Sequence, residues 1–424
     1  MRKPVVRAAA ILMGLMVVAL CLGGCGVGRY DWPRWRGPNG DGVSREKGWS
    51  PKSLTDGPKI LWKRTIGYGF SGVAVKGNRV YALGSDIPVA TVYCLDADTG
   101  EDLWTHTFED GVHAYCPAAS PTVDGASLYT LGSAGQVFCF DADSGEVVWE
   151  TDLVKEHGAL KPRYGFAASP IVEGGLLVIT ANAYGIVLDK GTGALVWKSP
   201  TTDPNGDGCS LIDAYATPVI FTREGRKHLC QFDDYGLYAV DLLTGDPSWF
   251  FPWPPERTGG WANVADPIVF SGKLFLSTGY GVGCALLDIR SAKPAILWQN
   301  KNMNNHVSTC VLVDGYLYGC HDPVGWGGGG ILRCLDARTG QVIWEQDFKR
   351  TVSLSAADGK LLILTERGLL AVADASPKAY RELSRVQVFD ENTTALCWTP
   401  PVLCRGRIYC RSRDGKLVCV NVRK

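Results

Sequence analysis

Seven tryptophans recur at nearly constant intervals, and this repeat constrains the fold more than any other feature of the sequence. The steps between them run from 42 residues (62 to 104) to 52 residues (197 to 249). The tryptophans are Trp62, Trp104, Trp149, Trp197, Trp249, Trp298 and Trp344, and the last six follow Asp96, Asp141, Asp189, Asp241, Asp288 and Asp336. A strand-rich unit of this length, repeated, is typical of a circular array of four-stranded blades.

Each unit carries the turn and strand signals of one blade. A small residue and a proline lead into an apolar strand, as in Ser120-Pro121, because the first residue of a strand needs no ladder donor. Five of the tryptophans follow an Asp-x-x-Thr/Ser-Gly turn, whereas the turns before Trp62 and Trp298 are eroded. In this turn the aspartate can accept from amides two residues on, and the glycine supplies a positive φ. We expect the tryptophan, on the fourth strand, to fill the wedge between neighbouring blades.

The two ends of the chain are predicted to complete one blade together. Units at 353–383 and 400–421 keep the strands without the tryptophan, and the second has only three strands. The segment Lys59–Lys63 has the character of an outer strand but has no blade before it. Pairing these ends would remove exposed sheet edges. We therefore predict an all-β fold: a single eight-bladed β-propeller of four-stranded antiparallel blades over residues 58–424, closed by the N-terminal strand.

An export signal is predicted ahead of the propeller. Arg2, Lys3 and Arg7 precede a short apolar run, residues 8–20, of the secretory type. The run ends in Leu22-Gly23-Gly24-Cys25, which resembles the lipobox of bacterial lipoproteins. We expect residues 1–24 to be a lipoprotein signal peptide, Cys25 to carry the lipid, and residues 25–57 to form a tether. The alternative is an uncleaved transmembrane anchor, for which the run is short.

The charge balance argues against one class of function, and the positions of the cysteines indicate a role in the core. The chain has 43 basic and 43 acidic residues without a block of either sign, which argues against nucleic-acid binding. Four of the fifteen cysteines, Cys94, Cys139, Cys334 and Cys419, occupy the position that Ala239 occupies in another unit. This pattern predicts small buried side chains. Most cysteines are therefore expected to be free thiols, with Cys310–Cys320 and Cys404–Cys410 as candidate disulfides.

The repeats resemble the pyrroloquinoline-quinone-type propeller repeat over nearly the whole mature chain. A lipobox followed by one eight-bladed propeller of this repeat is similar to the BamB-type lipoproteins of the outer-membrane β-barrel assembly machinery. The run Trp32-Pro33-Arg34-Trp35-Arg36-Gly37-Pro38-Asn39-Gly40-Asp41-Gly42, called the leader below, is outside that pattern and resembles the start of a set of exported propeller proteins. The resemblance implies export, and we expect a monomeric propeller held by its lipid at the periplasmic face of a membrane. Gly26, rather than aspartate, follows the lipidated cysteine, which favours the outer membrane. It also implies a binding role. We expect a scaffold with a protein partner in the cell envelope, and the resemblance does not identify that partner.

The repeat is also shared by quinoprotein dehydrogenases, which makes an enzyme the rival hypothesis. In those enzymes pyrroloquinoline quinone (PQQ) lies on the propeller axis with calcium and an aspartate base, often beneath a disulfide of adjacent cysteines. No Cys-Cys pair occurs in this sequence, and no step between tryptophans exceeds 52 residues, which leaves no room for the large insertions of those active sites. We therefore expect a binding protein without a catalytic residue or an obligatory cofactor, while PQQ and calcium remain alternatives.

Residues just before the inner strands are expected to line one mouth of the central channel. They are rich in aromatic and polar side chains, which suit a sugar, a quinone or a peptide. The candidates are Tyr68, Phe70, His113, Tyr115, Arg163, Tyr164, Tyr215, Trp261, Asn263, Asn305, His306 and Trp398. One alternative is that these side chains only cover the hole of the ring. Another is a carbohydrate-binding module, which would depend on Trp261 or Trp398.

One local motif matches the first half of a calcium-binding loop. Asp203, Asn205 and Asp207 alternate in Asp-Pro-Asn-Gly-Asp-Gly, which would offer oxygen ligands around a glycine turn. The twelfth position is Ala214 rather than glutamate. The same letters are also ordinary turn chemistry, so calcium at this loop and a simple turn are both open at the level of the sequence.

Overall fold

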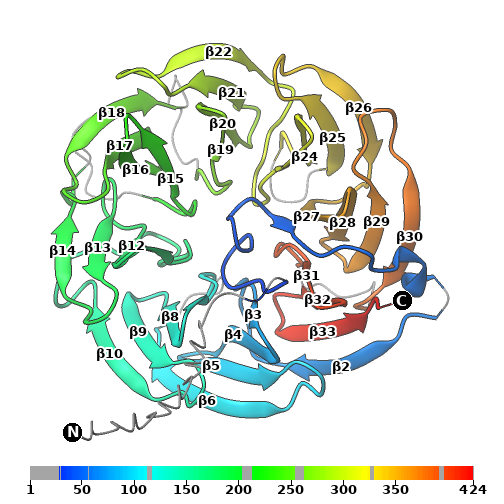
Figure 1. Cartoon of the computed structure of the whole chain (residues 1–424), viewed down its shortest axis with the longest axis horizontal. Coiled ribbons are helices and arrows are strands. Elements are labelled where there is room, and N and C mark those ends of the chain that lie inside the picture. The colour runs from blue at the N-terminus through cyan, green and yellow to red at the C-terminus, as the bar shows by residue number, and fades with distance from the viewer. Residues whose placement is uncertain are drawn as a thin grey trace, which may run out of the picture.

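The computed structural model describes residues 28, 30–55, 57–111, 117–202, 213–253, 262–324, 329–390 and 396–423. Over these residues the chain forms eight sheets, each with four antiparallel strands, arranged as the blades of a ring (Figure 1). The predicted eight-bladed propeller is confirmed. In the described residues, no helix is long and apolar enough to cross a membrane.

The first four blades follow one another along the chain. Blade 1 contains β3 (Ala74–Lys76), β4 (Arg79–Asp86), β5 (Val89–Asp96) and β6 (Asp102–Glu109), and blade 2 contains β7 (Thr122–Asp124), β8 (Ser127–Leu131), β9 (Gln136–Asp141) and β10 (Val147–Asp152). Blade 3 contains β11 (Ile171–Glu173), β12 (Leu176–Ile179), β13 (Ile186–Asp189) and β14 (Leu195–Lys198), and blade 4 contains β15 (Val219–Arg223), β16 (Arg226–Phe232), β17 (Gly236–Asp241) and β18 (Pro247–Pro252).

The remaining four blades complete the ring. Blade 5 contains β19 (Ile268–Phe270), β20 (Lys273–Thr278), β21 (Gly283–Asp288) and β22 (Ala295–Asn300), and blade 6 contains β23 (Val311–Val313), β24 (Tyr316–His321), β25 (Ile331–Asp336) and β26 (Val342–Asp347). Blade 7 contains β27 (Val352–Ala357), β28 (Lys360–Thr365), β29 (Leu369–Asp374) and β30 (Glu382–Gln387), and blade 8 contains β31 (Val402–Cys404), β32 (Arg407–Arg411), β33 (Lys416–Asn421) and the early strand β2 (Ile60–Thr65).

The ring closes through β2, as the sequence predicts. β2 pairs antiparallel with β33, and Trp62 lies opposite Cys419. In Figure 1 the blue strand β2 lies beside the red strand β33, so the two ends of the chain share one sheet. This pairing gives the last blade a fourth strand.

The repeated tryptophan and the repeated glycine are two halves of one contact between blades. The indole of Trp62, on blade 8, packs against Gly100 in the turn of blade 1, where a Cβ atom would lie 2.6 Å from Trp62 Cδ2. Gly100 has φ of 74°, which also favours glycine. Trp62 Nε1 donates to the carbonyl of Ala97, 3.0 Å away. The wedge role expected for the tryptophan is therefore shared with a fixed turn on the next blade.

We call this contact between a tryptophan and the turn of the next blade a seam. It recurs around the ring, and one of the seven tryptophans departs from it. The indole N–H groups donate to the following blade's turn in the pairs Trp104–Ala142, Trp149–Lys190, Trp197–Leu242, Trp298–Ala337 and Trp344–Ser376. The buried Nε1 of Trp249 has no partner in the structure. It faces blade 5, whose turn carries an Asp288–Arg290 ion pair instead of the Thr-Gly ending.

Inside each turn the aspartate works as predicted. Asp96 Oδ1 accepts from the amides of Asp98 at 2.8 Å and Thr99 at 2.9 Å. Such side-chain bonds hold the turn in the shape against which the indole packs.

The described part of the segment that we expected to act as a tether is built into the propeller. Trp32 is 3% exposed, and its backbone bonds to Val75 in the inner strand of blade 1. β1 (Val43–Ser44) pairs parallel with β27, and the 3-10 helix η1 (Pro51–Leu54) buries Leu54. Figure 1 shows the blue leader lying over the centre of the ring before it reaches β27.

The eleven cysteines that the structure describes are buried and free, including the two candidate disulfide pairs. Cys94, Cys139, Cys334 and Cys419 each lie opposite the tryptophan of their own blade. Burial raises the pKa of Cys94 to about 12, which makes a thiolate scarce at neutral pH. These cysteines are core residues.

Candidate axial binding site

A chain of hydrogen bonds runs around the axis, one blade to the next. In blades 1 to 5, the residue two positions before the inner strand donates its backbone N–H to the side chain of its counterpart on the following blade. The bonds are Gly72–Ser120 (2.7 Å), Ser120–Ser169 (2.9 Å), Ser169–Thr217 (3.2 Å), Thr217–Asp266 (2.7 Å) and Asp266–Thr309 (2.9 Å). Four of these residues, Ser120, Ser169, Thr217 and Asp266, precede a proline, which holds the preceding backbone extended.

Asp266 is the one carboxylate in this chain of hydroxyls, and it anchors the leader. Trp35 Nε1 donates to Asp266 Oδ2 at 2.7 Å, and Arg36 Nε lies 3.8 Å from the same oxygen. Asp266 Oδ1 accepts from Thr217 N. The leader thus fixes itself to the ring at the position where blade 5 departs from the hydroxyl pattern.

Burial opposes charge on both members of this pair. Desolvation raises the pKa of Asp266, and the nearby Arg36 guanidinium works against that shift. Desolvation also lowers the pKa of Arg36. Arg36 is 4% exposed and donates to the carbonyls of Gly40, Asp41 and Cys310. These neutral acceptors and Asp266 together hold a buried cation beneath the axis.

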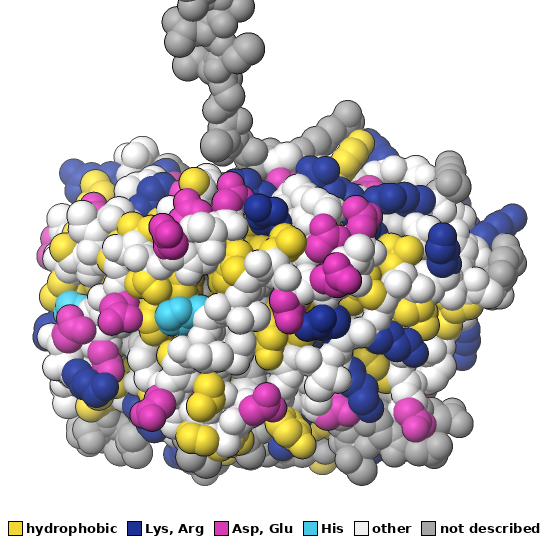
Figure 2. Space-filling view, turned by 90° about the horizontal axis from the view of Figure 1, so that it is seen from below, with side chains coloured by type: hydrophobic (Ala, Val, Ile, Leu, Met, Phe, Trp, Pro, Cys, Tyr) yellow, Lys and Arg dark blue, Asp and Glu magenta, His cyan; other side chains and the backbone are white. Residues whose placement is uncertain are grey.

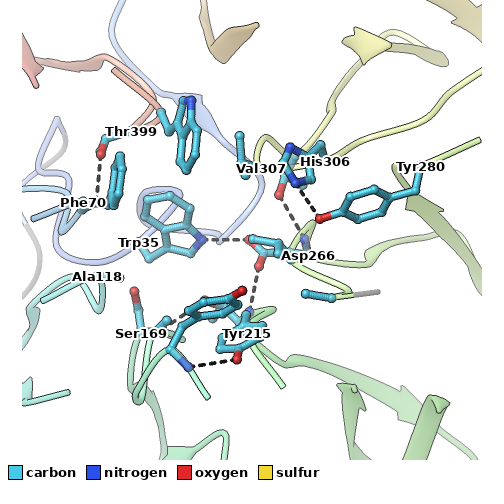
Figure 3. Close-up of a pocket in the computed structure, with 17 residues that line it drawn as sticks. Trp35, Phe70, Ala118, Ser169, Tyr215, Asp266, Tyr280, His306, Val307 and Thr399 are labelled. Carbon is cyan, nitrogen blue, oxygen red and sulfur yellow. Dashed lines mark hydrogen bonds between the residues drawn. The ribbon is translucent and has the colours of Figure 1, made fainter. Parts of the chain in front are cut away.

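A cavity of about 170 Å³ lies on the axis above Trp35, and we call it the axial cavity. Side chains reach it from the leader and from the segments that lead into blades 1 to 6 and blade 8 (Figure 3). It is lined by Trp35, Phe70, Ala118, Tyr164, Ala167, Ser169, Tyr215, Thr217, Ala262, Val264, Asp266, Tyr280, His306, Val307, Thr309, Trp398 and Thr399. The wall is therefore mainly aromatic, with one carboxylate.

The aromatic rings are held by contacts with one another. Phe70 and Trp398 stack with centroids 4.8 Å apart and planes 10° apart. On the other side of the cavity, Tyr280 Oη lies 2.7 Å from His306 Nε2 (Figure 3). Tyr215 Oη donates to Asp213 and accepts from the amide of Tyr164. Rings fixed in this way form a preorganised wall.

Burial favours the neutral form of the histidine in this wall. His306 is 4% exposed, and burial lowers its pKa although Asp322 lies 3.9 Å from its Nδ1. Burial also raises the pKa of Tyr280 to about 12 and that of Tyr215 well above its usual range. Asp266, whose own pKa burial raises, is the acidic side chain of the described wall.

The structure brings together only part of the predicted axial set. Phe70, Tyr164, Tyr215, His306 and Trp398 line the axial cavity. Tyr68 is 51% exposed and bridges to Ser85. The remaining described candidates serve other contacts: Arg163 pairs with Asp213, Asn263 bonds to Asp233 and Thr278, and Asn305 bonds to Cys320 and Ser277. His113, Tyr115 and Trp261 lie outside the described residues.

Among the members of the wall that the sequence reasoning missed, three have an aromatic or charged side chain: Trp35, Asp266 and Tyr280. Trp35 lies in the leader, which was treated as tether, and Tyr280 lies in the loop between the second and third strands of blade 5. Asp266 had a usable signal, because it stands before proline where the three preceding blades have serine or threonine. Asp266 was not distinguished from the other residues before a proline, because the repeat has such a residue in several blades.

The described residues do not fit PQQ. A three-ring quinone with three carboxylates needs cationic partners, but the axial cavity offers Asp266 and neither lysine nor arginine among its described lining residues. Its volume is also below the usual range for sites that enclose larger ligands. In the described part of the chain, no group of three or more His, Cys, Asp or Glu side chains is arranged to hold a metal ion. The predicted calcium loop (Asp203, Asn205 and Asp207) and the lipidation site Cys25 lie outside the described residues.

Comparison with known proteins places the whole propeller in one family. A family model described as "Outer membrane protein assembly factor BamB" matches residues 54–126, 88–324 and 328–424. BamB from Moraxella catarrhalis is a similar solved structure, with 16% identity, coverage of 86% of this chain and 99% of that chain, and a TM-score of 0.65. No curated protein matches the chain.

Solved dehydrogenases have the same fold. Quinohemoprotein alcohol dehydrogenase from Comamonas testosteroni matches with 13% identity, 92% of this chain, 80% of that chain and a TM-score of 0.69. A europium-containing methanol dehydrogenase matches with 14% identity, 90% of this chain, 89% of that chain and a TM-score of 0.67. At these identities the likeness establishes the fold alone.

Proposed function

The chain belongs to the family described as outer membrane protein assembly factor BamB, and from that membership we propose that it is a protein-binding scaffold of the cell envelope. Lipid on Cys25 would hold the disc at the periplasmic face of the outer membrane. Its partner would be a protein of outer-membrane β-barrel assembly. Strands or loops of the partner would be captured on the rim of the disc.

The observation that carries this proposal is a repeated apolar feature on the rim. On five outer strands the residue directly before the tryptophan is an exposed aliphatic side chain. These residues are Leu103 (45% exposed), Val148 (59%), Val196 (44%), Leu297 (46%) and Ile343 (43%). An aliphatic side chain exposed at the same position of each of these strands would give a partner protein a regular set of apolar contacts.

The backbone of the same strands supports a specific mode of binding. β6, β10, β14, β22 and β26 are the outermost strands of their sheets, with a neighbour on one side only over the described residues. Such an edge presents N–H and C=O groups to an added strand, and neighbouring aliphatic side chains select it. Figure 2 shows one side of the disc, where hydrophobic side chains reach the surface between interspersed charges of both signs. The mixed charge leaves side-chain packing and backbone pairing as the recognition elements.

The test is a pull-down of the full chain from native membranes in mild detergent, with mass spectrometry of the bound proteins. Recovery of an outer-membrane β-barrel assembly protein is the expected result. Val148→Arg and Leu297→Arg should each reduce that recovery by disrupting the apolar rim. Glu150→Arg, on the same outer strand β10 as Val148, is the matched control and should leave recovery intact. Recovery of no envelope protein, or equal recovery with all three variants, would refute the rim mechanism.

A further inference from the structure

The axial cavity has the composition of a receptor for an organic cation. Six rings of Phe, Tyr and Trp face it, and Asp266 is the acidic member of its described wall. The negative faces of aromatic rings attract cations that have few hydrogen-bond donors. The rings come from segments separated along the chain, and the closed propeller and the leader bring them together at the axis (Figure 3).

The carboxylate in this wall is bonded mainly by neutral groups. Asp266 accepts from the Trp35 indole and the Thr217 amide, neither of which carries a charge. Arg36 Nε forms a buried ion pair with Asp266 Oδ2 at 3.8 Å and offsets part of its charge, while Arg36 Nη2 donates to the carbonyls of Asp41 and Cys310. Because this ion pair is longer than a direct hydrogen bond, a cation in the axial cavity would meet a carboxylate whose charge Arg36 neutralises only in part.

Four hydroxyl groups of the wall form hydrogen bonds within the propeller itself. Ser169, Thr217 and Thr309 accept backbone N–H groups of the preceding blade, and Thr399 donates to the carbonyl of Phe70. A sugar needs many hydrogen bonds to replace its hydration, and a primary ammonium needs acceptors for three N–H groups. A fully alkylated ammonium needs none.

We infer that the axial cavity binds a quaternary ammonium group of the choline type. Its volume of about 170 Å³ is close to that of cavities known to hold one benzene-sized group, which suits a trimethylammonium head. The rings would surround the methyl groups, and Asp266 would balance the charge. The source of the group is either a small molecule or the head of a phosphocholine lipid, since both carry the same cation.

Calorimetric titration of the purified full chain tests the chemistry with a matched pair of ligands. Choline and 3,3-dimethylbutan-1-ol have nearly the same shape, but only choline is charged. Choline should bind about tenfold more tightly, as expected for a cation among aromatic rings with a carboxylate. Equal affinity for the two, or no binding of choline and of phosphocholine, would overturn the inference. Dodecylphosphocholine below its micelle concentration and free choline distinguish the two sources, and preferential binding of either supports the cation site.

Variants test the residues independently of the ligand pair. Trp398→Leu removes one ring and should weaken choline binding about tenfold, whereas Trp398→Phe should keep it within about threefold because an aromatic face remains. Asp266→Asn should reduce the preference for choline over its neutral analogue, because the rings remain but the carboxylate is lost. Tyr68→Leu, at an exposed tyrosine outside the cavity lining, is the control and should bind choline normally. Thermal denaturation of each variant separates lost binding from lost folding, and the ligand pair on the unaltered chain tests the charge even where Asp266→Asn fails to fold.

Failure of this inference leaves the proposed scaffold untouched. The pull-down depends on rim residues of the outer strands, and the titration depends on residues of the axis. Unchanged choline affinity in Trp398→Leu would refute the ring site without affecting recovery of a partner protein.

Discussion

The contact between blades 4 and 5 differs from the regular contact between neighbouring blades. Between blades 1 and 2, Trp104 packs on Gly145 and donates to Ala142, as the repeat prescribes. Between blades 4 and 5, Trp249 is more deeply buried than Trp104, but its Nε1 has no acceptor in the structure. Blade 5 departs from the repeat at its axial end too, where Asp266 replaces a hydroxyl and anchors Trp35.

Residues of the repeat serve two different contacts, one between neighbouring blades and one with the leader. Where the repeat is kept, its side chains serve the contact between blades. Where blade 5 breaks it, Asp266 serves the leader, which is outside the repeat. The structure offers no such compensating use for the lost acceptor of Trp249. The departure at the axis therefore has a visible structural role, and the departure at the rim does not.

The largest expected effect comes from giving blade 5 the residue of blade 4. Asp266→Thr restores the hydroxyl pattern of Thr217 but removes the carboxylate beside buried Arg36 and the acceptor of Trp35. An uncompensated buried charge typically costs about 3–5 kcal/mol. Urea unfolding should show this loss of stability, and hydrogen exchange should show faster exchange in residues 32–44. Thr309→Ser, which keeps the hydroxyl bonded to Asp266 N, is the control; equal stability of both variants would contradict the anchor.

A substitution at the glycine of a regular seam should destabilise the protein. In Gly145→Ala the added Cβ would lie 2.5 Å from Trp104 Cδ2 at a φ of 79°. Left-handed strain and overpacking together should cost about 2–4 kcal/mol. Gly125→Ala also has a positive φ, of 58°, but meets nothing within 4 Å, so it should cost only about 1 kcal/mol. Calorimetric melting of the two variants compares them, and equal losses would show that the indole contact is unimportant.

The two kinds of seam should respond differently to removal of the indole N–H. Trp62→Phe leaves the buried carbonyl of Ala97 without its donor, whereas Trp249→Phe removes a buried donor that has no partner. The two tryptophans are similarly buried, at 7% and 6% exposure, so the loss of apolar contact is matched. Trp62→Phe should be more destabilising by about 1–2 kcal/mol in urea unfolding. A larger loss in Trp249→Phe would contradict the contrast between the seams.

Acid should weaken the sector next to blade 5, with the smallest effect of the four. Burial and the charge of Arg333 lower the pKa of His321 to about 4, although Glu345 acts in the opposite direction. Burial lowers the pKa of His306 as well. Because both folded pKa values lie below the unfolded value of about 6.5, stability is fully present above pH 6.5 and falls as the pH drops toward 4.

Hydrogen exchange at pH 7 and pH 5, corrected for intrinsic rates, checks this expectation. Amides of blade 6, which carries His321 on β24, should lose protection before those of blade 2. His321→Asn removes one titrating group and should reduce the difference. An unchanged pH response in that variant would exclude His321 as a cause.

The outer part of the molecule was predictable because its contacts repeat along the sequence. Trp104 and Gly145 are separated by about one blade, so the spacing of letters reports the spacing in space. The four-stranded blades, the turn of Asp96 and the closure by Trp62 were all confirmed for this reason. Cys94 and its counterparts were recognisable as core residues from their fixed register with the tryptophan.

The axial site was only half predictable. Tyr164, Tyr215, His306 and Trp398 were found because they precede inner strands. Asn263 fits the same rule, but its amide is used within the fold, bonding to Asp233 and Thr278. Position along a strand places a residue near the axis, but hydrogen-bond partners from other segments decide where its side chain points.

The sequence by itself determined the eight blades, the seams between them and the closure of the ring, because a blade cannot bury its faces without an identical neighbour. Only the tertiary structure decided that Trp35 and Asp266, 231 residues apart, meet on the axis. That contact has no periodic signal. It forms because the closed ring holds one unmatched carboxylate where the leader crosses its centre, and burial makes the carboxylate require a donor.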